Sequence, residues 1–171
     1  MSDKKFYTVP FVWSRTLWVM TFAVFILWIC YSAWSLWQIY TSEVSISYLV
    51  SLITINIVML PAVILCEGLA PQRLEIGERK LVILRRYKSI TIEADRVLSV
   101  EALPKNALRG AVRVCGVSGM FGYFGNFYIK KIGAFKLFAT NFDNLFLITL
   151  IGGNKIVISC SEPERMTHFK Y

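Results

Sequence analysis

The sequence predicts a membrane protein in which a hairpin of two transmembrane helices is followed by an all-β domain with a short C-terminal helix. Three observations support this fold class. Hydrophobic residues make up 56% of the 171 residues, and the mean hydropathy of +0.53 is high for a soluble protein. Two stretches near the N-terminus contain no Asp, Glu, Lys or Arg. From residue 73 onward, short apolar runs alternate with turn residues, which is the pattern of β-strands.

The two charge-free stretches cover residues 16–42 and 44–66, and each exceeds the roughly 20 residues that cross a bilayer core. We therefore predict transmembrane helices at about 16–41 and 45–66. A cleaved signal peptide is the rival interpretation of the first stretch, but its apolar part exceeds the roughly 7 to 15 residues of such a segment. Aromatic residues mark both ends of the first helix, as at membrane interfaces. They are Trp13, Trp18, Trp34, Trp37 and Tyr40.

The charges that flank the hairpin predict its orientation. Lys4, Lys5 and Arg15 precede the first helix and six basic residues follow the second, whereas the connection carries only Glu43. Both termini are therefore expected in the cytoplasm. The four cysteines have no CxxC or Cys/His spacing, and Cys115 and Cys160 would lie in reducing cytosol, so no disulfide or metal site is expected.

Several polar residues lie inside the predicted helices. Asn56 would bond the backbone of its own helix or face a third helix from another chain, and the sequence leaves both alternatives open. Pro61 is expected to bend the second helix. Small polar residues on the facing sides would let the two helices approach closely. They are Ser32, Ser35, Ser47, Ser51 and Thr54.

After a first segment of residues 1–66, residues 67–72 are interpreted as a linker and residues 73–171 as the β domain. Strands are expected near 73–76, 80–86, 89–93, 97–102, 126–131, 135–139, 145–150 and 155–160.

Local motifs in this domain predict its turns and its end. Gly77 with Glu78 is expected to turn one hairpin, and residues 152–154 another. At the C-terminus, Ser161 as N-cap and Glu164 three residues later form a capping box around Pro163. The capping box predicts a helix through Phe169.

Short antiparallel strands closed by one helix describe a barrel like that of pleckstrin-homology (PH) domains. The sequence of this region resembles bacterial PH-like domains found behind two transmembrane helices in small membrane proteins, particularly of the Bacteroidetes group. The resemblance implies a PH-like barrel at the bacterial cytoplasmic (inner) membrane, without implying a particular activity. The family's usual C-terminal helix is longer than the one expected here. The segments that carry the resemblance are "RLEIGERKLVILRR", "ITIEADRVLSVEAL", "GMFGYFGNFY", "FATN" and "GGNKIVISCSEPE".

The block "GMFGYFG" at residues 119–125 has neither the GK[ST] of a phosphate loop nor the strand and helix of a dinucleotide site around it. Two interpretations remain. In the favoured one, the glycines permit a bent strand crossing while the aromatic side chains fill the core. In the other, Met120, Phe121 and Tyr123 form an apolar tip that contacts the membrane or a partner.

From Glu67 onward the chain holds 16 Lys and Arg against 9 Asp and Glu, a net charge of +7. Basic groups beside a membrane contribute about 1 kcal/mol each toward binding an anionic leaflet. Six of them in the first hairpin are candidate ligands for lipid headgroups, although the same charges would also set topology alone. They are Arg73, Arg79, Lys80, Arg85, Arg86 and Lys88.

Catalysis has little support in the sequence. The only histidine is His168, and Asp143 with Asn144 is typical of a turn, so nothing pairs a nucleophile with a base. No cofactor motif occurs, and no cofactor is expected.

The leading hypothesis is a non-enzymatic, membrane-anchored adaptor or accessory subunit. It would dock an integral membrane protein or a second copy of itself through Asn56, Met120, Phe121 and Tyr123. A sensor of anionic lipids is the alternative. Nucleic-acid binding is more remote and no nucleic acid is expected, because the sequence holds no RNA or DNA motif.

Overall fold

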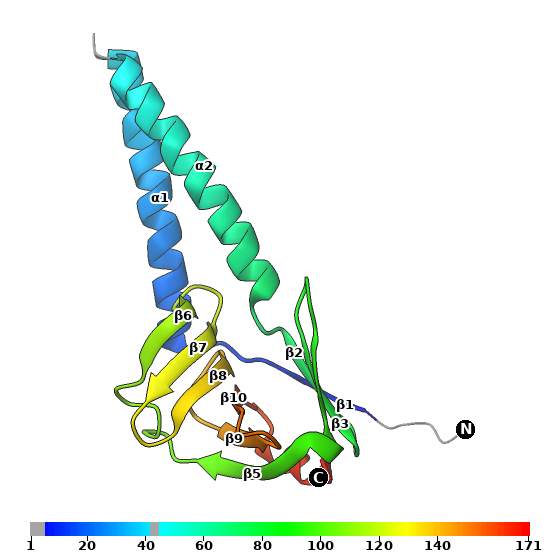
Figure 1. Ribbon diagram of the computed structural model, residues 1–171. Coiled ribbons are helices and arrows are strands. Elements are labelled where there is room, and N and C mark those ends of the chain that lie inside the picture. The colour runs from blue at the N-terminus through cyan, green and yellow to red at the C-terminus, as the bar shows by residue number, and fades with distance from the viewer. Residues whose placement is uncertain (1–5, 42–44) are drawn as a thin grey trace.

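The computed structural model describes residues 6–41 and 45–171, in which two long helices stand on a β domain (Figure 1). Helix α1 spans Arg15–Thr41 and helix α2 spans Ser45–Leu69. Both are long and apolar enough to cross a membrane, and many of their large apolar side chains are exposed. Helix α2 continues three residues beyond its expected end, so part of the expected linker 67–72 is helical. Three of the charged residues that predict the orientation lie outside the described residues. They are Lys4, Lys5 and Glu43.

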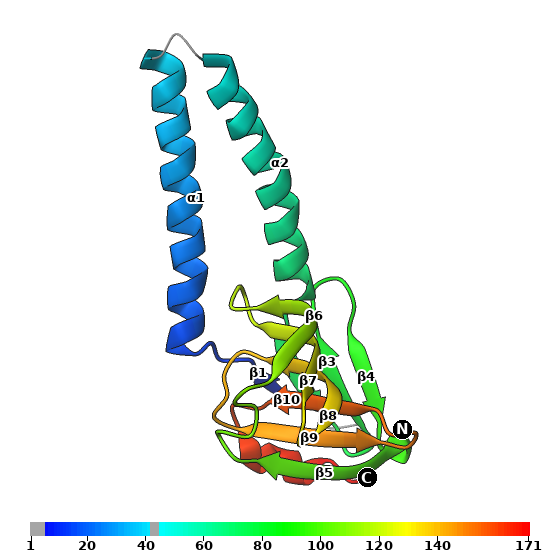
Figure 2. The same cartoon turned by 60° about the vertical axis from the view of Figure 1, so that its left-hand side comes forward.

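The helices lie close together at the end where they are connected and diverge toward the β domain (Figures 1 and 2). Ser35 is fully buried, as expected for a small residue where helices approach. The hydroxyls of Ser51 and Thr54 instead donate to carbonyl oxygens of their own helix, those of Tyr48 at 2.9 Å and Val50 at 2.8 Å.

The first sheet contains a strand that the sequence analysis missed. Strand β1, Tyr7–Pro10, precedes the first helix and pairs antiparallel with β2 of the β domain. The β domain therefore begins before α1, and the two helices are an insertion between its first two strands. The sheet has the order β1-β2-β3-β4. The later strands are β2 (Arg73–Ile76), β3 (Lys80–Leu84) and β4 (Ile90–Glu93).

The second sheet has six strands in the order β5-β9-β10-β8-β7-β6, with one parallel pair between β8 and β10. Strand β6 was not expected from the sequence, and β7 begins three residues before its expected start. The strands are β5 (Val97–Leu103), β6 (Val112–Ser118), β7 (Tyr123–Ile129), β8 (Gly133–Ala139), β9 (Leu145–Leu150) and β10 (Lys155–Ser159).

The main core lies between the two sheets, and a second cluster covers the other face of the six-stranded sheet. Strand β9 illustrates both, because Ile148 belongs to the main core and its neighbour Leu147 belongs to the second cluster. A strand buried on both faces is apolar at successive positions, which explains the run "LFLITL".

The expected C-terminal helix is a 3-10 turn, η2, at Pro163–His168. The predicted capping box is also wrong, because the hydroxyl of Ser161 donates to the carbonyl of Pro10 at 2.8 Å. A helix of so few residues is unstable without tertiary contacts. Buried Met166 and Phe169 supply those contacts by anchoring the turn to the main core.

Candidate functional site

Hydrogen bonds hold the segment between β1 and α1 to the β domain. We call this contact the N-terminal junction. The hydroxyl of Thr140 and the amide of Asn141 donate to the carbonyl of Val12, at 2.8 and 3.1 Å. The backbone amide of Ser14 donates to the carbonyl of Thr140 at 3.0 Å. One of the segments that carry the PH-like resemblance, "FATN", thus supplies the groups that hold the start of α1.

Residues 119–122 of the glycine block form the turn between β6 and β7, and residues 123–125 begin β7. The turn rests on α1, and we call this contact the loop junction. The backbone amide of Phe121 donates to the hydroxyl oxygen of Thr21 at 3.4 Å, and the Phe121 ring meets Phe25 and Trp13 edge-on. Phe121 has a φ of +58°, which a bulky residue rarely adopts. Part of the tip that was a candidate partner contact is therefore engaged with the chain's own helix.

Two glycines of this hairpin are required by close backbone approach. Gly116 lies directly opposite Gly125 in the β6–β7 pair. A Cβ at Gly116 would lie 2.2 Å from the carbonyl oxygen of Phe124, and one at Gly125 would lie 2.3 Å from that of Cys115. Their role in this region is architectural, as the favoured interpretation of the block requires.

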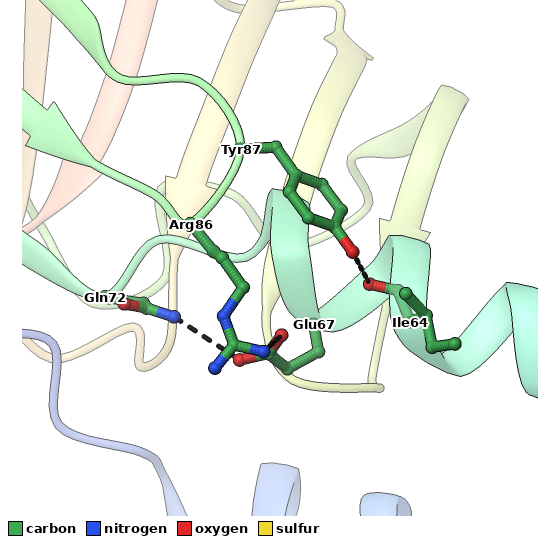
Figure 3. A network of polar contacts seen from close by, with 5 residues as sticks. All are labelled: Ile64, Glu67, Gln72, Arg86 and Tyr87. Carbon is green, nitrogen blue, oxygen red and sulfur yellow. Dashed lines mark hydrogen bonds and ion pairs between the residues drawn. The ribbon is translucent and has the colours of Figure 1, made fainter.

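The end of α2 is held by the connection between β3 and β4, which we call the strap junction (Figure 3). The Tyr87 hydroxyl donates to the carbonyl of Ile64 at 3.3 Å, and its backbone amide donates to that of Gly68 at 3.1 Å. Arg86 forms an ion pair with Glu67 at 2.7 Å. A Cβ at Gly68 would lie 2.0 Å from the Tyr87 ring, so the ring packs where only glycine leaves room.

The six basic residues of the first hairpin do not form one cluster. Arg73 lies at the end of the sheet that follows α2, whereas Arg79 and Lys80 lie in or beside the β2–β3 turn at the opposite end. The register from Arg73 to Ile76 separates these ends by three residue steps, or about 10 Å. Charges this far apart on a surface are largely screened at physiological salt.

The helix-facing group of this set comprises Arg73, Arg85, Arg86 and Lys88, and two of its members already have partners. Arg86 pairs with Glu67, and Arg85 donates to the Lys88 carbonyl at 2.6 Å while lying over the Phe138 ring. Burial lowers the pKa of Arg85. Arg73 and Lys88 are exposed.

The expected partner contacts are dispersed over the molecule. The Asn56 amide donates to the Leu52 carbonyl of its own helix at 2.8 Å, which is one of the two alternatives. Met120 is partly buried beside Phe121 in the loop junction. The Tyr123 ring lies 4.6 Å from that of Phe142, and burial raises the pKa of Tyr123.

A second basic region, not among the expected sites, lies outside the first hairpin. Residues 102–142 contain no Asp or Glu and six Lys or Arg, a run that is visible in the sequence. Among the described residues, only Lys105 of these six forms an ion pair, with Asp143 at 2.9 Å. The other five are exposed around strands β6, β7 and β8, and we call them the basic sheet end. They are Arg109, Arg113, Lys130, Lys131 and Lys136.

A groove of about 320 Å³ opens between β4 and the second sheet. Its wall includes Ile90, Ile92 and Ile156, and Glu93 and Arg96 form an ion pair at its rim, at 3.5 Å. The volume lies at the lower limit for small-molecule sites.

Residues with potential for chemistry have structural roles. The His168 ring stacks on Tyr7 of β1 at 4.5 Å, and Asp143 pairs with Lys105. Burial raises the pKa of the Cys160 thiol, which stays protonated at neutral pH. Within residues 6–41 and 45–171, no three His, Cys, Asp or Glu residues lie together as metal ligands would.

Comparison with known proteins identifies the β domain. A family model described as "Bacterial PH domain" matches residues 72–170. No curated protein and no solved structure matches. The matched region excludes β1 and both helices.

Proposed function

The chain belongs to the bacterial PH domain family, and from this premise we propose that it is a non-enzymatic adaptor that docks a protein partner at the inner leaflet. Helices α1 and α2 would anchor it in the bacterial cytoplasmic membrane with both termini in the cytoplasm. PH-like domains generally bind rather than catalyse. The basic residues after α2 favour this orientation.

The observation that carries the proposal is the attachment of the β domain to both helices at three junctions. A domain that acted alone in the cytosol would need only a flexible tether. Here Thr140 holds the start of α1, Phe121 packs on its next turns, and Tyr87 packs on the end of α2. Such contacts fix the orientation of the domain relative to the membrane, which suits a partner held in the same membrane.

The test is to crosslink native membranes, purify the chain in several mild detergents and identify what accompanies it by mass spectrometry. We expect a stoichiometric protein partner. The Tyr87→Ala variant should reduce its yield, because it frees the domain at the strap junction. The matched control is Tyr171→Ala, at an exposed tyrosine in no junction. A lone monomer in every detergent would overturn the proposal.

Anionic-lipid binding is a second candidate, supported by the exposed positions of Arg73 and Lys88 beside the end of α2. Native mass spectrometry of the purified chain should show retained anionic lipid that decreases in the Arg73→Gln/Lys88→Gln variant. Arg79→Gln/Lys80→Gln, at the far end of the hairpin, is the control. Equal retention by both variants would rule this candidate out.

A further inference from the structure

Strand β6 is an open edge of the six-stranded sheet. It ends the strand order, and among the described residues no strand pairs with its outer side. Six of its seven residues are exposed, with Val112 at 62% and Val114 at 68%. An exposed edge strand offers unpaired backbone N–H and C=O groups to an added strand.

A β-bulge limits the length of β6 that is free to pair with an added strand. The register of β6 on β7 shifts between Arg113 and Cys115, and Val114 is the extra residue. Bulges and charges on edges commonly prevent copies of a protein from pairing with themselves. The regular stretch from Cys115 to Ser118 stays open beyond the bulge.

The charge around this edge has one sign. Arg113 lies opposite Phe127 on one face of the sheet, and Lys136 shares the other face with Cys115 through Asn126. Lys130 and Lys131 lie in the connection from β7 to β8. A strand added to β6 would place its side chains alternately over the two faces, next to Arg113 on one face, while Lys136 on the other face lies on β8, two strands beyond β6.

We propose that β6 binds an extended, acidic segment of a protein partner as an added strand, beside the basic sheet end. This inference rests on the proposed adaptor function and names its partner's chemistry. A second copy is the poorer fit through β6 itself, because β6 carries Arg113 and no acidic residue, so a second β6 would add positive charge beside the basic sheet end. The opposite edge strand, β5, carries Glu101 and no basic residue, so it lacks the same complementarity.

The ends of β6 and β7 opposite their turn lie away from the helices, which favours a protein segment over lipid headgroups as the occupant. The β6–β7 turn touches α1 at Thr21, and β7 runs from there away from the helices (Figure 1). Ile129 lies six residue steps along β7 from Tyr123, or about 20 Å at the rise of a strand.

The experiment uses the full chain in its native membrane, with a photoreactive phenylalanine analogue in place of Val114. The control replaces Leu98, which is 67% exposed on β5, with the same analogue. After irradiation, the crosslinked peptides are sequenced by mass spectrometry. We expect the Val114 position to capture a segment of another protein with an excess of Asp and Glu, and the Leu98 position not to capture it.

Charge reversal tests the electrostatic part. Arg113→Glu/Lys136→Glu should lower the capture at least roughly tenfold, because like charges replace complementary ones. Arg79→Glu/Lys170→Glu changes the net charge equally at exposed positions outside the basic sheet end and should leave capture unchanged. An unaltered unfolding temperature confirms that each variant is folded.

Several results would overturn the inference. They are capture of a second copy of the chain, of lipid or of nucleic acid, capture of a segment without excess acid, equal capture at both positions, and no capture. If one of these results is obtained but gentle purification still returns a stoichiometric partner, the adaptor function is supported and only the proposed role of β6 is refuted. If purification also returns a monomer, both proposals fall.

Discussion

At the scale of single residues, the chain uses glycine where another chain segment needs the room of a side chain. Gly68 is the clearest case, because the Tyr87 ring occupies the space that a Cβ would take. The choice of residue in the last turn of α2 therefore depends on a tyrosine 19 positions further along the chain. Helix propensity alone would favour alanine there, by up to about 1 kcal/mol.

This dependence predicts a coupling between the two residues. In the wild-type chain Gly68→Ala should leave the free energy of unfolding unchanged or lower it. The added Cβ displaces the Tyr87 ring and breaks its hydrogen bond to Ile64, which is worth about 1 kcal/mol. In a Tyr87→Ala background the same change should stabilise the chain. Thermal unfolding of the four proteins in detergent gives the coupling energy, which we expect to be at least about 1 kcal/mol.

Tyr87→Phe serves as the control, because it keeps the ring and removes only the hydroxyl. Gly68→Ala should remain unfavourable in that background. If Gly68→Ala has one effect in all three backgrounds, the ring does not occupy the space beside Gly68.

At the scale of elements, β1 joins the N-terminal segment to the PH-like domain. Val9 is 1% exposed and lies opposite Leu74 of β2, and His168 of η2 stacks on Tyr7. The family match begins only at residue 72, so β1 extends the sheet beyond the region that the family model matches. Its contacts fix where α1 starts.

The contribution of β1 is measurable by one substitution. Val9→Ala should lower the free energy of unfolding of the β domain by about 2 kcal/mol, from the lost apolar contact and the cavity left behind. Thr8→Ala, at the exposed neighbouring position of the same strand, should change it little. Hydrogen exchange of the β2 and β3 amides in detergent reports both. Equal effects of the two variants would mean that β1 adds nothing to the domain.

At the scale of the whole molecule, two helices are inserted between β1 and β2, so both of their domain-facing ends would emerge on one side of a membrane that the helices cross. The chain enters α1 at Arg15 and leaves α2 at Leu69, and the β domain binds both ends. The basic residues around these ends favour the cytoplasmic side. The β domain and the domain-facing ends of both helices would therefore lie on the same side of the membrane.

Cys115 provides a test of this orientation, since it is exposed on β6 whereas Cys160 is buried. A membrane-impermeant maleimide should label Cys115 in inside-out vesicles and leave it unlabelled in intact spheroplasts. The Cys115→Ser variant identifies any signal from the other thiols. Labelling of Cys115 in spheroplasts alone would place the β domain on the opposite face.

Much of the fold was predictable, because its signals are local. The apolar lengths of α1 and α2 and the strands from β2 to β5 and from β8 to β10 follow from runs of neighbouring residues. The PH-like domain also followed from its motifs. The site was less predictable, since the six basic residues of the first hairpin are adjacent in sequence but lie at two ends of a sheet. The acid-free run of residues 102–142 was visible, but its position beside an open edge was not.

Two long apolar helices and a series of short strands follow from the sequence alone, since apolar length and strand alternation are properties of neighbouring residues, and the PH type followed from the resemblance of its motifs. Only the tertiary structure decided that β1 belongs to this domain, that β6 is a strand, and that the C-terminal element is a 3-10 turn. Strand β1 and the 3-10 turn are short segments stabilised by partners distant in the sequence, whereas β6 pairs with β7, the next strand in the chain, and most of its residues are exposed. The Ser161 hydroxyl bonds Pro10, and no pattern within either segment specifies such a contact.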